Sequence, residues 1–507
     1  MIAQATIFVS HAWRHEFLDV VAALEDWDEH QSVRAVFWFD IFSVNQHDTI
    51  VRDFTWWSTT FKDSVKKLGH TLLVLEWDDP KPLSRAWCLW EIASTVDTKS
   101  VFQVLMSPKN QGSFSRTLVD NFDRIIYKTC NVDLAKAEAF KVSDRNNIRK
   151  AVKAMGGGFD EVNKQVIGVM KEWMAQSGKE ALERLPKNHM TTSRFQNYLA
   201  RFLFDQGKLD EAKPLFISAL KRFRRNPGDT HPDTLAIINN LATLLQAQGN
   251  TNEAEPLLRE ALVGYRYTLG VTHPNTLRTM NNLASILYAK GDLEVAEPLF
   301  RKIVELKRRS LGDSDPDTLR SIHNLGMLLN DQGKLGEAEP LLKEALEGRR
   351  RILGDNHPET LHSINILGMF FLEEQGKLGE AEPLLQKFFD KSHRIHGDSH
   401  PDTLTSINNL SILLSKQGKQ TEAELLFRES LERTRRDLGD THPSTLKSIY
   451  NLGACLMAQE KLDEAEALFR KAWETARETL GDRHPSTRMY LDNLVELSKG
   501  LRRRERK

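Results

Sequence analysis

The sequence lacks the features that mark several large classes of protein. Its three cysteines are isolated from one another, which excludes a disulfide framework and a C-x-x-C metal site. It has no run of about 18 apolar residues to span a membrane, and no apolar leader opens it. Lysine plus arginine (70) equal aspartate plus glutamate (70), so no basic excess favours a nucleic acid. We expect a cytoplasmic protein without a metal site, a nucleic-acid partner or a membrane span.

Tryptophan is distributed unevenly and divides the chain. Nine of the ten tryptophans precede residue 180, and only Trp473 follows it. A chain of 507 residues also exceeds what one hydrophobic core usually supports. We therefore predict an N-terminal domain over residues 1–180, a linker over 181–190, a second domain over 191–500 and a basic tail over 501–507.

The second domain is internally repetitive. A His-Pro dipeptide recurs every 42 residues, with Asp315-Pro316 in place of one copy and a single residue inserted before the copy at His400. Self-similarity at such a period is typical of stacked supersecondary units. The histidines of this dipeptide are His231, His273, His357, His400, His442 and His484.

Each repeat contains two runs of apolar residues at helical spacing, and in most repeats a glycine such as Gly333 separates them. A glycine can adopt the left-handed conformation that ends a helix, and Gly354 is placed to end the second helix. The proline of His-Pro suits the first turn of the next helix, where its missing N–H has no partner to lose. The pattern predicts helical hairpins. We interpret the recurrent histidines as turn residues, because stacked repeats hold them too far apart to share a metal.

The motif G-x-x-x-E-A-x-x-L-x-x-x-A-L in these repeats resembles the tetratricopeptide (TPR) repeat. The 42-residue length and the N-N-L-A and H-P-x-T segments most resemble the kinesin light chain subgroup. This resemblance implies an all-α superhelical solenoid of about seven hairpins, the first of them degenerate, and a C-terminal capping helix. A small residue at the helix-packing position agrees with it. These residues are Ala242, Ala284, Gly326, Gly368, Ser411 and Gly453.

Two rows of residues recur at the repeat period and predict a binding surface. Homologous positions of stacked repeats point the same way. In TPR domains that clamp peptides, the position of one asparagine row faces the concave groove, where an amide both donates and accepts hydrogen bonds. Basic residues four positions earlier suggest a ligand with carboxylates. Alternatively, the asparagines are tolerated in the helices or cap a neighbouring loop. The asparagines are Asn240, Asn282, Asn324, Asn409, Asn451 and Asn493, interrupted by Ile366, and the basic row holds Arg278, Arg320, His362 and Lys447.

Residues 1–180 alternate short apolar runs with amphipathic stretches. Strands buried on both faces have such runs, so we expect a doubly wound α/β domain of the flavodoxin-like type. Functional residues of such domains follow the carboxyl ends of the strands. The segment 10–14 after the first strand and the segment 84–92 after the third would then meet at one crevice. The strands are predicted at 7–9, 36–39, 72–75 and 101–105.

The sequences F-V-S-H-A at the first strand, W-F-D at the second and S-R-A-W-C-L-W-E-I at 84–92 resemble Toll/interleukin-1 receptor (TIR) domains. In NAD-cleaving TIR domains the glutamate of the W-C-x-x-E helix is catalytic. The resemblance implies that Glu91 stabilises an oxocarbenium-like ribose as nicotinamide departs, and Trp13 and Arg14 match the first loop of that pocket by position. The segment after the second strand departs from this pattern and resembles the W-I-D-x-x-x-I-N-Q segment of fungal heterokaryon-incompatibility domains. A glutamate in the first turns of a helix is also favoured by the helix dipole without any chemistry.

These resemblances imply three alternative functions. The first is a protein–protein interaction scaffold, whose groove binds a protein or an acidic peptide while the TIR-like domain signals by self-association. The second is an assembly-regulated NAD+ hydrolase that uses Glu91, with NAD+ as substrate and no required cofactor. The third is a cargo adaptor like kinesin light chain, although the sequence has no heptad-repeat helix of the kind through which that family joins its motor. We favour the scaffold.

Overall fold

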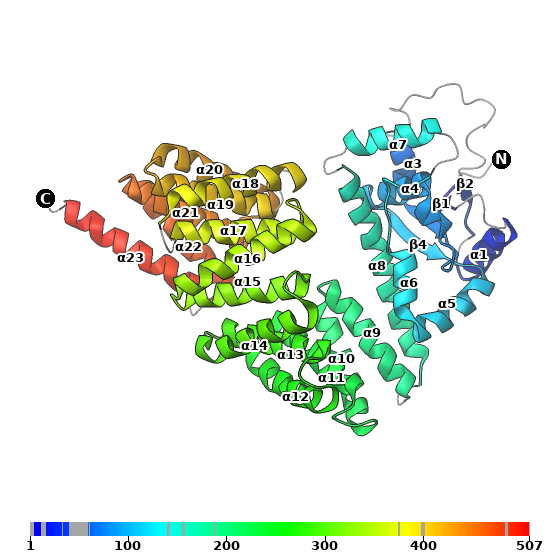
Figure 1. The fold of residues 1–507 in the computed structure, drawn as a ribbon. Helices are drawn as coiled ribbons and strands as arrows, with labels where there is room; N and C mark the ends of the chain where they lie inside the picture. Colours follow the sequence, from blue (N-terminus) through cyan, green and yellow to red (C-terminus); the bar gives the residue numbers. More distant parts are fainter. Residues whose placement is uncertain are drawn as a thin grey trace. The chain divides into compact units, whose positions relative to one another are not determined.

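Contacts within the computed structural model divide the chain into two compact units, Met1–Thr268 and Leu269–Lys507 (Figure 1). Among the described residues, no helix is both long and apolar enough to cross a membrane. The residues that the structure describes are 5–11, 17–32, 34–39, 59, 61–138, 142–154, 158–186, 189–373, 376–396, 401–481 and 485–505.

The first unit contains a four-stranded sheet in which every pair of neighbours is parallel. Its strands are β1 (Ile7–Ser10), β2 (Phe37–Phe39), β3 (His70–Val74) and β4 (Val101–Leu105). The spatial order is β2-β1-β3-β4, and Val9 of β1 lies between Phe39 and Leu72. The four predicted strands are therefore present, and the first and third are neighbours, as the predicted crevice between them requires.

Helices cover both faces of this sheet, which explains the continuous apolar runs of its strands. The helices around it are α1 (Phe17–Glu29), α3 (Phe61–Leu68), α4 (Ala86–Asp97), α5 (Pro108–Asp120), α6 (Phe122–Thr129) and α7 (Val142–Ala154), with the short 3-10 helix η2 (Lys81–Ser84). Phe8 and Leu73 pack in one core with α3 and α4, whereas Val9 and Leu72 pack in another with α1. Because alternate residues of a strand face opposite sides, both sets must be apolar.

The long helix α8 (Gly158–Arg184) packs against both the sheet region and the first repeat helix, α9 (Met190–Asp205). In its first half, Val166 joins the core beneath the sheet. Near its end, α8 lies so close to α9 that a Cβ on Gly178 would be 2.7 Å from Leu199 Cδ1. The α/β region and the first hairpin are thus joined through a shared helix.

The repeats form seven helical hairpins and a final helix over the described residues, as predicted. Gly333 between two helices of a hairpin has φ 73°, and Gly354 after the second helix has φ 80°, which a residue with a Cβ rarely adopts. After α9, the helices are α10 (Leu209–Arg225), α11 (Pro232–Ala247), α12 (Thr251–Leu269), α13 (Pro274–Ala289), α14 (Leu293–Leu311), α15 (Pro316–Asp331), α16 (Leu335–Leu353), α17 (Pro358–Glu373), α18 (Leu378–His396), α19 (Pro401–Lys416), α20 (Gln420–Leu438), α21 (Pro443–Ala458), α22 (Leu462–Leu480) and α23 (Pro485–Glu505).

The recurrent histidines cap the helices that follow them. Nδ1 of His273 accepts a hydrogen bond from the backbone N–H of Asn275 at 3.2 Å, and His231, His357 and His442 do the same two residues ahead. The carboxylate of Asp315 serves this purpose in the repeat that lacks the histidine. Such a cap satisfies an otherwise unpaired N–H of the first helical turn. The interpretation of these histidines as turn residues is confirmed at these positions, while His400 and His484 lie outside the described residues.

The small residues of the TPR motif lie where helices approach closely. A Cβ on Gly326 would be 2.9 Å from Leu342 Cδ2, and one on Gly453 would be 2.9 Å from Phe469 Cε1. The second helix of each of these hairpins therefore packs against backbone, which a larger side chain would prevent.

Candidate functional site

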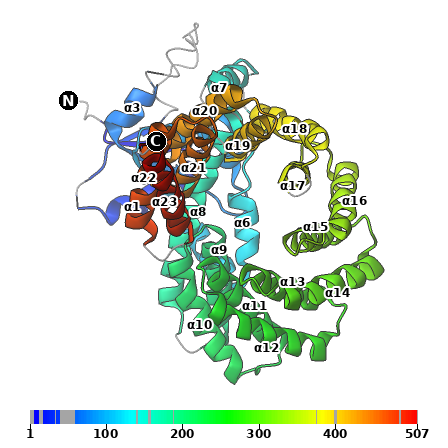
Figure 2. The same ribbon diagram turned by 90° about the vertical axis from the view of Figure 1, so that its left-hand side faces the viewer.

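The predicted basic row lies on exposed positions of the first helices of the hairpins. Arg278, Arg320, His362 and Lys447 are all exposed, on α13, α15, α17 and α21. In the second unit, α15 and α17 lie on the inner side of the curve that α13 to α18 follow, and α14, α16 and α18 lie on its outer side (Figure 2). These side chains are therefore accessible to a ligand that approaches the first helices.

The asparagine row lies deeper than the basic row, between neighbouring first helices. Asn409 is 6% exposed, and its Nδ2 donates to Oδ1 of Asn365 in the preceding repeat at 2.6 Å. Asn240 donates in the same way to Asn197, at 3.4 Å. These contacts link neighbouring repeats, a role that differs from both the groove-lining and the loop-capping interpretations of the sequence. Peptide binding by the row stays a prediction.

The last asparagines of the row make different contacts. Asn493 Nδ2 donates to the carbonyl of Met489 in its own helix at 2.8 Å. Among the described residues, Nδ2 of Asn451 is buried without a hydrogen-bond partner. A buried N–H donor without a partner costs free energy.

Two buried cationic residues on the second helices of the hairpins were not identified from the sequence. Lys307 on α14 is 6% exposed and Arg349 on α16 is 3% exposed. They occupy homologous positions one repeat apart, and the other repeats have an uncharged residue there. The sequence could have indicated them, because a charged residue at a repeat position that is uncharged in the other copies points to a local role. The homologous residues are Phe223, Tyr265, Ser392, Thr434 and Ala476.

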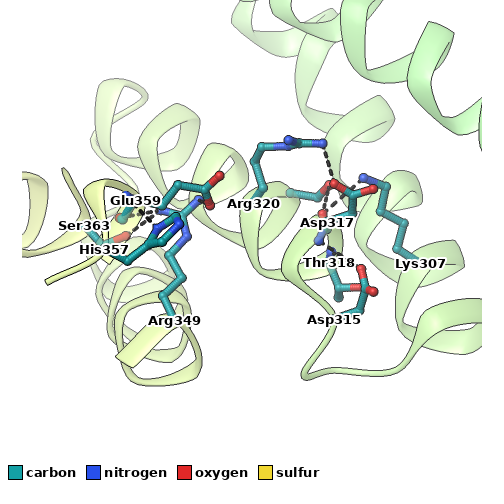
Figure 3. Close-up of polar contacts among 10 residues, drawn as sticks. Lys307, Asp315, Asp317, Thr318, Arg320, Arg349, His357, Glu359 and Ser363 are labelled. Carbon is teal, nitrogen blue, oxygen red and sulfur yellow. Dashed lines mark hydrogen bonds and ion pairs between the residues drawn. The ribbon is translucent and has the colours of Figure 1, made fainter. Parts of the chain in front are cut away.

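Each of these cations hydrogen-bonds to the first turns of the next helix (Figure 3). Lys307 Nζ donates to the backbone carbonyl of Asp317 at 3.1 Å. Arg349 Nη1 donates to the backbone carbonyl of Glu359 at 3.3 Å and to Ser363 Oγ at 2.6 Å, and Nη2 lies 3.4 Å from a carboxylate oxygen of Glu359. Burial lowers the pKa of both cationic groups, and the carboxylates nearby oppose that shift. Their role is to join consecutive hairpins.

A buried imidazole lies beside Arg349. His323 on α15 is 3% exposed, and within the described part of the chain neither of its ring nitrogens has a hydrogen-bond partner. Its ring centroid is 5.3 Å from that of His362 on α17. Burial, Arg349 and His362 lower the pKa of His323 to about 3, so the ring is neutral at physiological pH.

A pocket of about 150 Å³ lies between α19 and α21. It brings together Asn409 of the asparagine row and Lys447 of the basic row. Between α15 and α17, a second pocket of about 130 Å³ is lined mainly by apolar side chains, Ile366 among them. The α19–α21 pocket is therefore the place where the two predicted rows meet in a concave site.

In the first unit, the predicted crevice brings Glu91 to the carboxyl end of β1. Glu91 is 4% exposed, and Ser10 Oγ donates to its Oε2 at 2.5 Å. On the same helix, Sγ of Cys88 lies 3.5 Å from the backbone carbonyl oxygen of His11. The predicted meeting of the segments after the first and third strands is confirmed for these residues. Trp13, Arg14 and the segment 40–47 after the second strand lie outside the described residues.

Family models identify the repeats. One tetratricopeptide repeat model matches residues 191–266, 236–309, 275–350, 317–387 and 365–436, and another of the same description matches 445–486. Together they span more than half of the 507 residues. The chain is a tetratricopeptide repeat protein. No curated protein matches it.

Several solved structures are similar to this TPR protein. The TPR-like repeats of a protein assigned as a kinesin light chain of Podosopora anserina are 26% identical, with 41% of this chain and 97% of that chain covered and a TM-score of 0.38. BtubC (BKLC) of P. vanneervenii is 20% identical, covering 48% and 94%, with a TM-score of 0.37. The quorum sensor NprR of B. thuringiensis in its apo form is 12% identical, covering 77% and 97%, with a TM-score of 0.49.

Proposed function

We propose that this TPR protein is an interaction scaffold whose first helices bind an extended segment of a partner protein. The observation that carries the proposal is the row of exposed basic side chains beside a deeper row of amides, of which Lys447 and Asn409 line the α19–α21 pocket. Amides hold a peptide backbone without reading its sequence, and the cations select acidic side chains. The preferred ligand is therefore an acidic peptide.

The N-terminal α/β region is proposed to be TIR-like and to pass on the signal by self-association. Support comes from apolar side chains at the start of α1, where Leu18 is 77% exposed and Phe17 is 53% exposed. Neighbouring exposed apolar side chains favour association with another surface. Binding of a partner by the repeats would bring several such regions together.

Replacing Asn282 and Asn324 together by alanine should weaken the binding of a peptide ligand about tenfold. Two hydrogen bonds of roughly 0.5–1.5 kcal/mol each account for a loss of this size. The measurement is a titration of the full chain with a peptide that the wild-type protein selects from a random library. As a control, Gln386→Ala removes an exposed amide from α18, and it should change neither binding nor stability. A double variant that unfolds at a much lower temperature than the wild type would show that these asparagines are structural.

Cleavage of NAD+ is a second candidate, because Glu91 lies at the carboxyl end of β1 where this fold places functional groups. The burial of Glu91 and its hydrogen bond with Ser10 nevertheless favour a structural role. We expect the full chain, free or clustered on beads, to release no nicotinamide from NAD+. The assay compares the wild type with Glu91→Gln, which keeps a hydrogen-bond acceptor for Ser10. Nicotinamide release by the wild type that this substitution abolishes would establish the hydrolase instead.

A further inference from the structure

The TPR array fills two of its own inter-repeat spaces with long cationic side chains. Arg349 extends from α16 to the carbonyl of Glu359 and the hydroxyl of Ser363, which follow it by 10 and 14 residues (Figure 3). Lys307 extends from α14 to the carbonyl of Asp317, again 10 residues ahead. In both cases the second helix of one hairpin supplies a donor to the start of the next hairpin.

The homologous position on α20 is Thr434, and its shorter side chain makes no such connection. Thr434 is 1% exposed, and its hydroxyl donates to the carbonyl of Leu431 in its own helix at 3.1 Å. Ser444 and Ser448 follow it at the same separations as Glu359 and Ser363 follow Arg349. The α19–α21 pocket lies at this position and is lined by both Thr434 and Ser444. The shorter Thr434 thus leaves open a space whose equivalent beside α16 is occupied by the side chain of Arg349.

The side chains around this pocket favour an anionic group. Among the described residues that line it, Lys447 is the one charged side chain, and none is a carboxylate. Nδ1 of His442 accepts a hydrogen bond from the backbone N–H of Ser444. The proton of the neutral ring is therefore on Nε2, which is a further hydrogen-bond donor beside the pocket. The counterpart of Ser444 in the filled space is Glu359, so the negative charge that balances Arg349 there is absent here.

We propose that the α19–α21 pocket holds one carboxylate of the partner polypeptide, which pairs with Lys447, and that Thr434 is the residue that admits it. The pocket volume of about 150 Å³ suits a single acidic side chain or a chain terminus. The inference rests on the proposed function, since the carboxylate belongs to the peptide that the first helices bind. The small size of Thr434 therefore leaves room for an acidic residue in this repeat, whereas Arg349 fills the equivalent space two repeats earlier.

The test fills the pocket with the side chains that occupy the equivalent space beside α16. The double variant Thr434→Arg/Ser444→Glu reproduces the arrangement of Arg349 and Glu359. Lys447→Gln removes the proposed counter-charge and leaves the pocket open. Thr421→Arg is the matched control, because it places the same substitution on an exposed position of the same helix. Each full-length variant and the wild type are screened against random peptide libraries, one with free and one with amidated C termini, and the selected peptides are titrated.

We expect the wild type to select peptides with an acidic residue at one fixed position. The filled variant should bind them at least tenfold more weakly, Lys447→Gln should lose the acidic preference, and Thr421→Arg should behave as the wild type. Dependence on a free C terminus would identify the carboxylate as terminal, and its absence would identify a side chain. If the filled and Lys447→Gln variants select the same peptides with unchanged affinity, the pocket proposal is wrong while the scaffold stands. If the wild type selects no peptide from either library, both proposals fail.

Discussion

Replacing Gly348 by leucine should destabilise the repeats by about 3 kcal/mol, near the upper end of overpacking costs in protein cores. A Cβ at this position of α16 would lie 2.4 Å from Cδ2 and 3.2 Å from Cγ of Leu319. Leu319 is itself only 2% exposed, so it has little room to move aside. The measurement is the urea concentration at which the full chain loses half of its helical circular dichroism.

Gly336 on the same helix is the matched control. A Cβ there would have no atom within 4 Å, and the position is exposed. Because leucine has a higher helix propensity than glycine, Gly336→Leu should leave the unfolding midpoint unchanged or raise it slightly. Equal midpoints for Gly336→Leu and Gly348→Leu would contradict the close packing of α16 on α15.

Acid should destabilise the repeats through His323, and His323→Asn should remove most of that sensitivity. The pKa of His323 is lowered from 6.5 to about 3 by burial, by Arg349 and by His362. Below pH 6.5 the unfolded chain binds a proton at this residue and the folded chain does not, so the free energy of unfolding falls as the pH drops from 6.5 towards 3. Between pH 8 and pH 5 the loss amounts to about 2 kcal/mol.

Asparagine is the replacement that the array itself uses at this position, as at Asn281 and Asn365 in the neighbouring repeats. The experiment compares urea unfolding midpoints at pH 8 and pH 5 for the wild type, His323→Asn and the control His393→Asn, whose histidine is exposed. The wild type and the control should lose stability at pH 5, and His323→Asn should lose clearly less. The same loss in all three proteins would show that the acid sensitivity arises elsewhere.

The helices of the repeats were predictable because their signals are local. The hairpins are specified by apolar spacing, in most of them by a glycine such as Gly333, and by a capping residue two positions before its backbone partner, as in His273. Such features act within one or two helical turns, and repetition over seven copies removed the ambiguity. The sheet was predictable for a similar reason, since strands buried on both faces read as continuous apolar runs.

The geometry of the proposed binding surface could be predicted only in part. The exposure of the basic row followed from helical geometry, and Arg320 and Lys447 lie where that geometry placed them. The depth of the asparagine row did not follow, because the hydrogen bond from Asn409 to Asn365 depends on the distance between two helices from different repeats. Helix spacing is determined by the packing of many side chains and cannot be read from the pattern of one repeat.

By itself, the sequence determined the repeat period, the hairpins, their caps and the parallel strands, because hydrogen bonding and apolar spacing within short segments are sufficient for them. The tertiary structure alone decided that Arg349 fills one inter-repeat space while Thr434 leaves the equivalent space open. These features depend on side chains that distant segments contribute to the same volume. Whether such a volume is filled or open is a property of the packed chain.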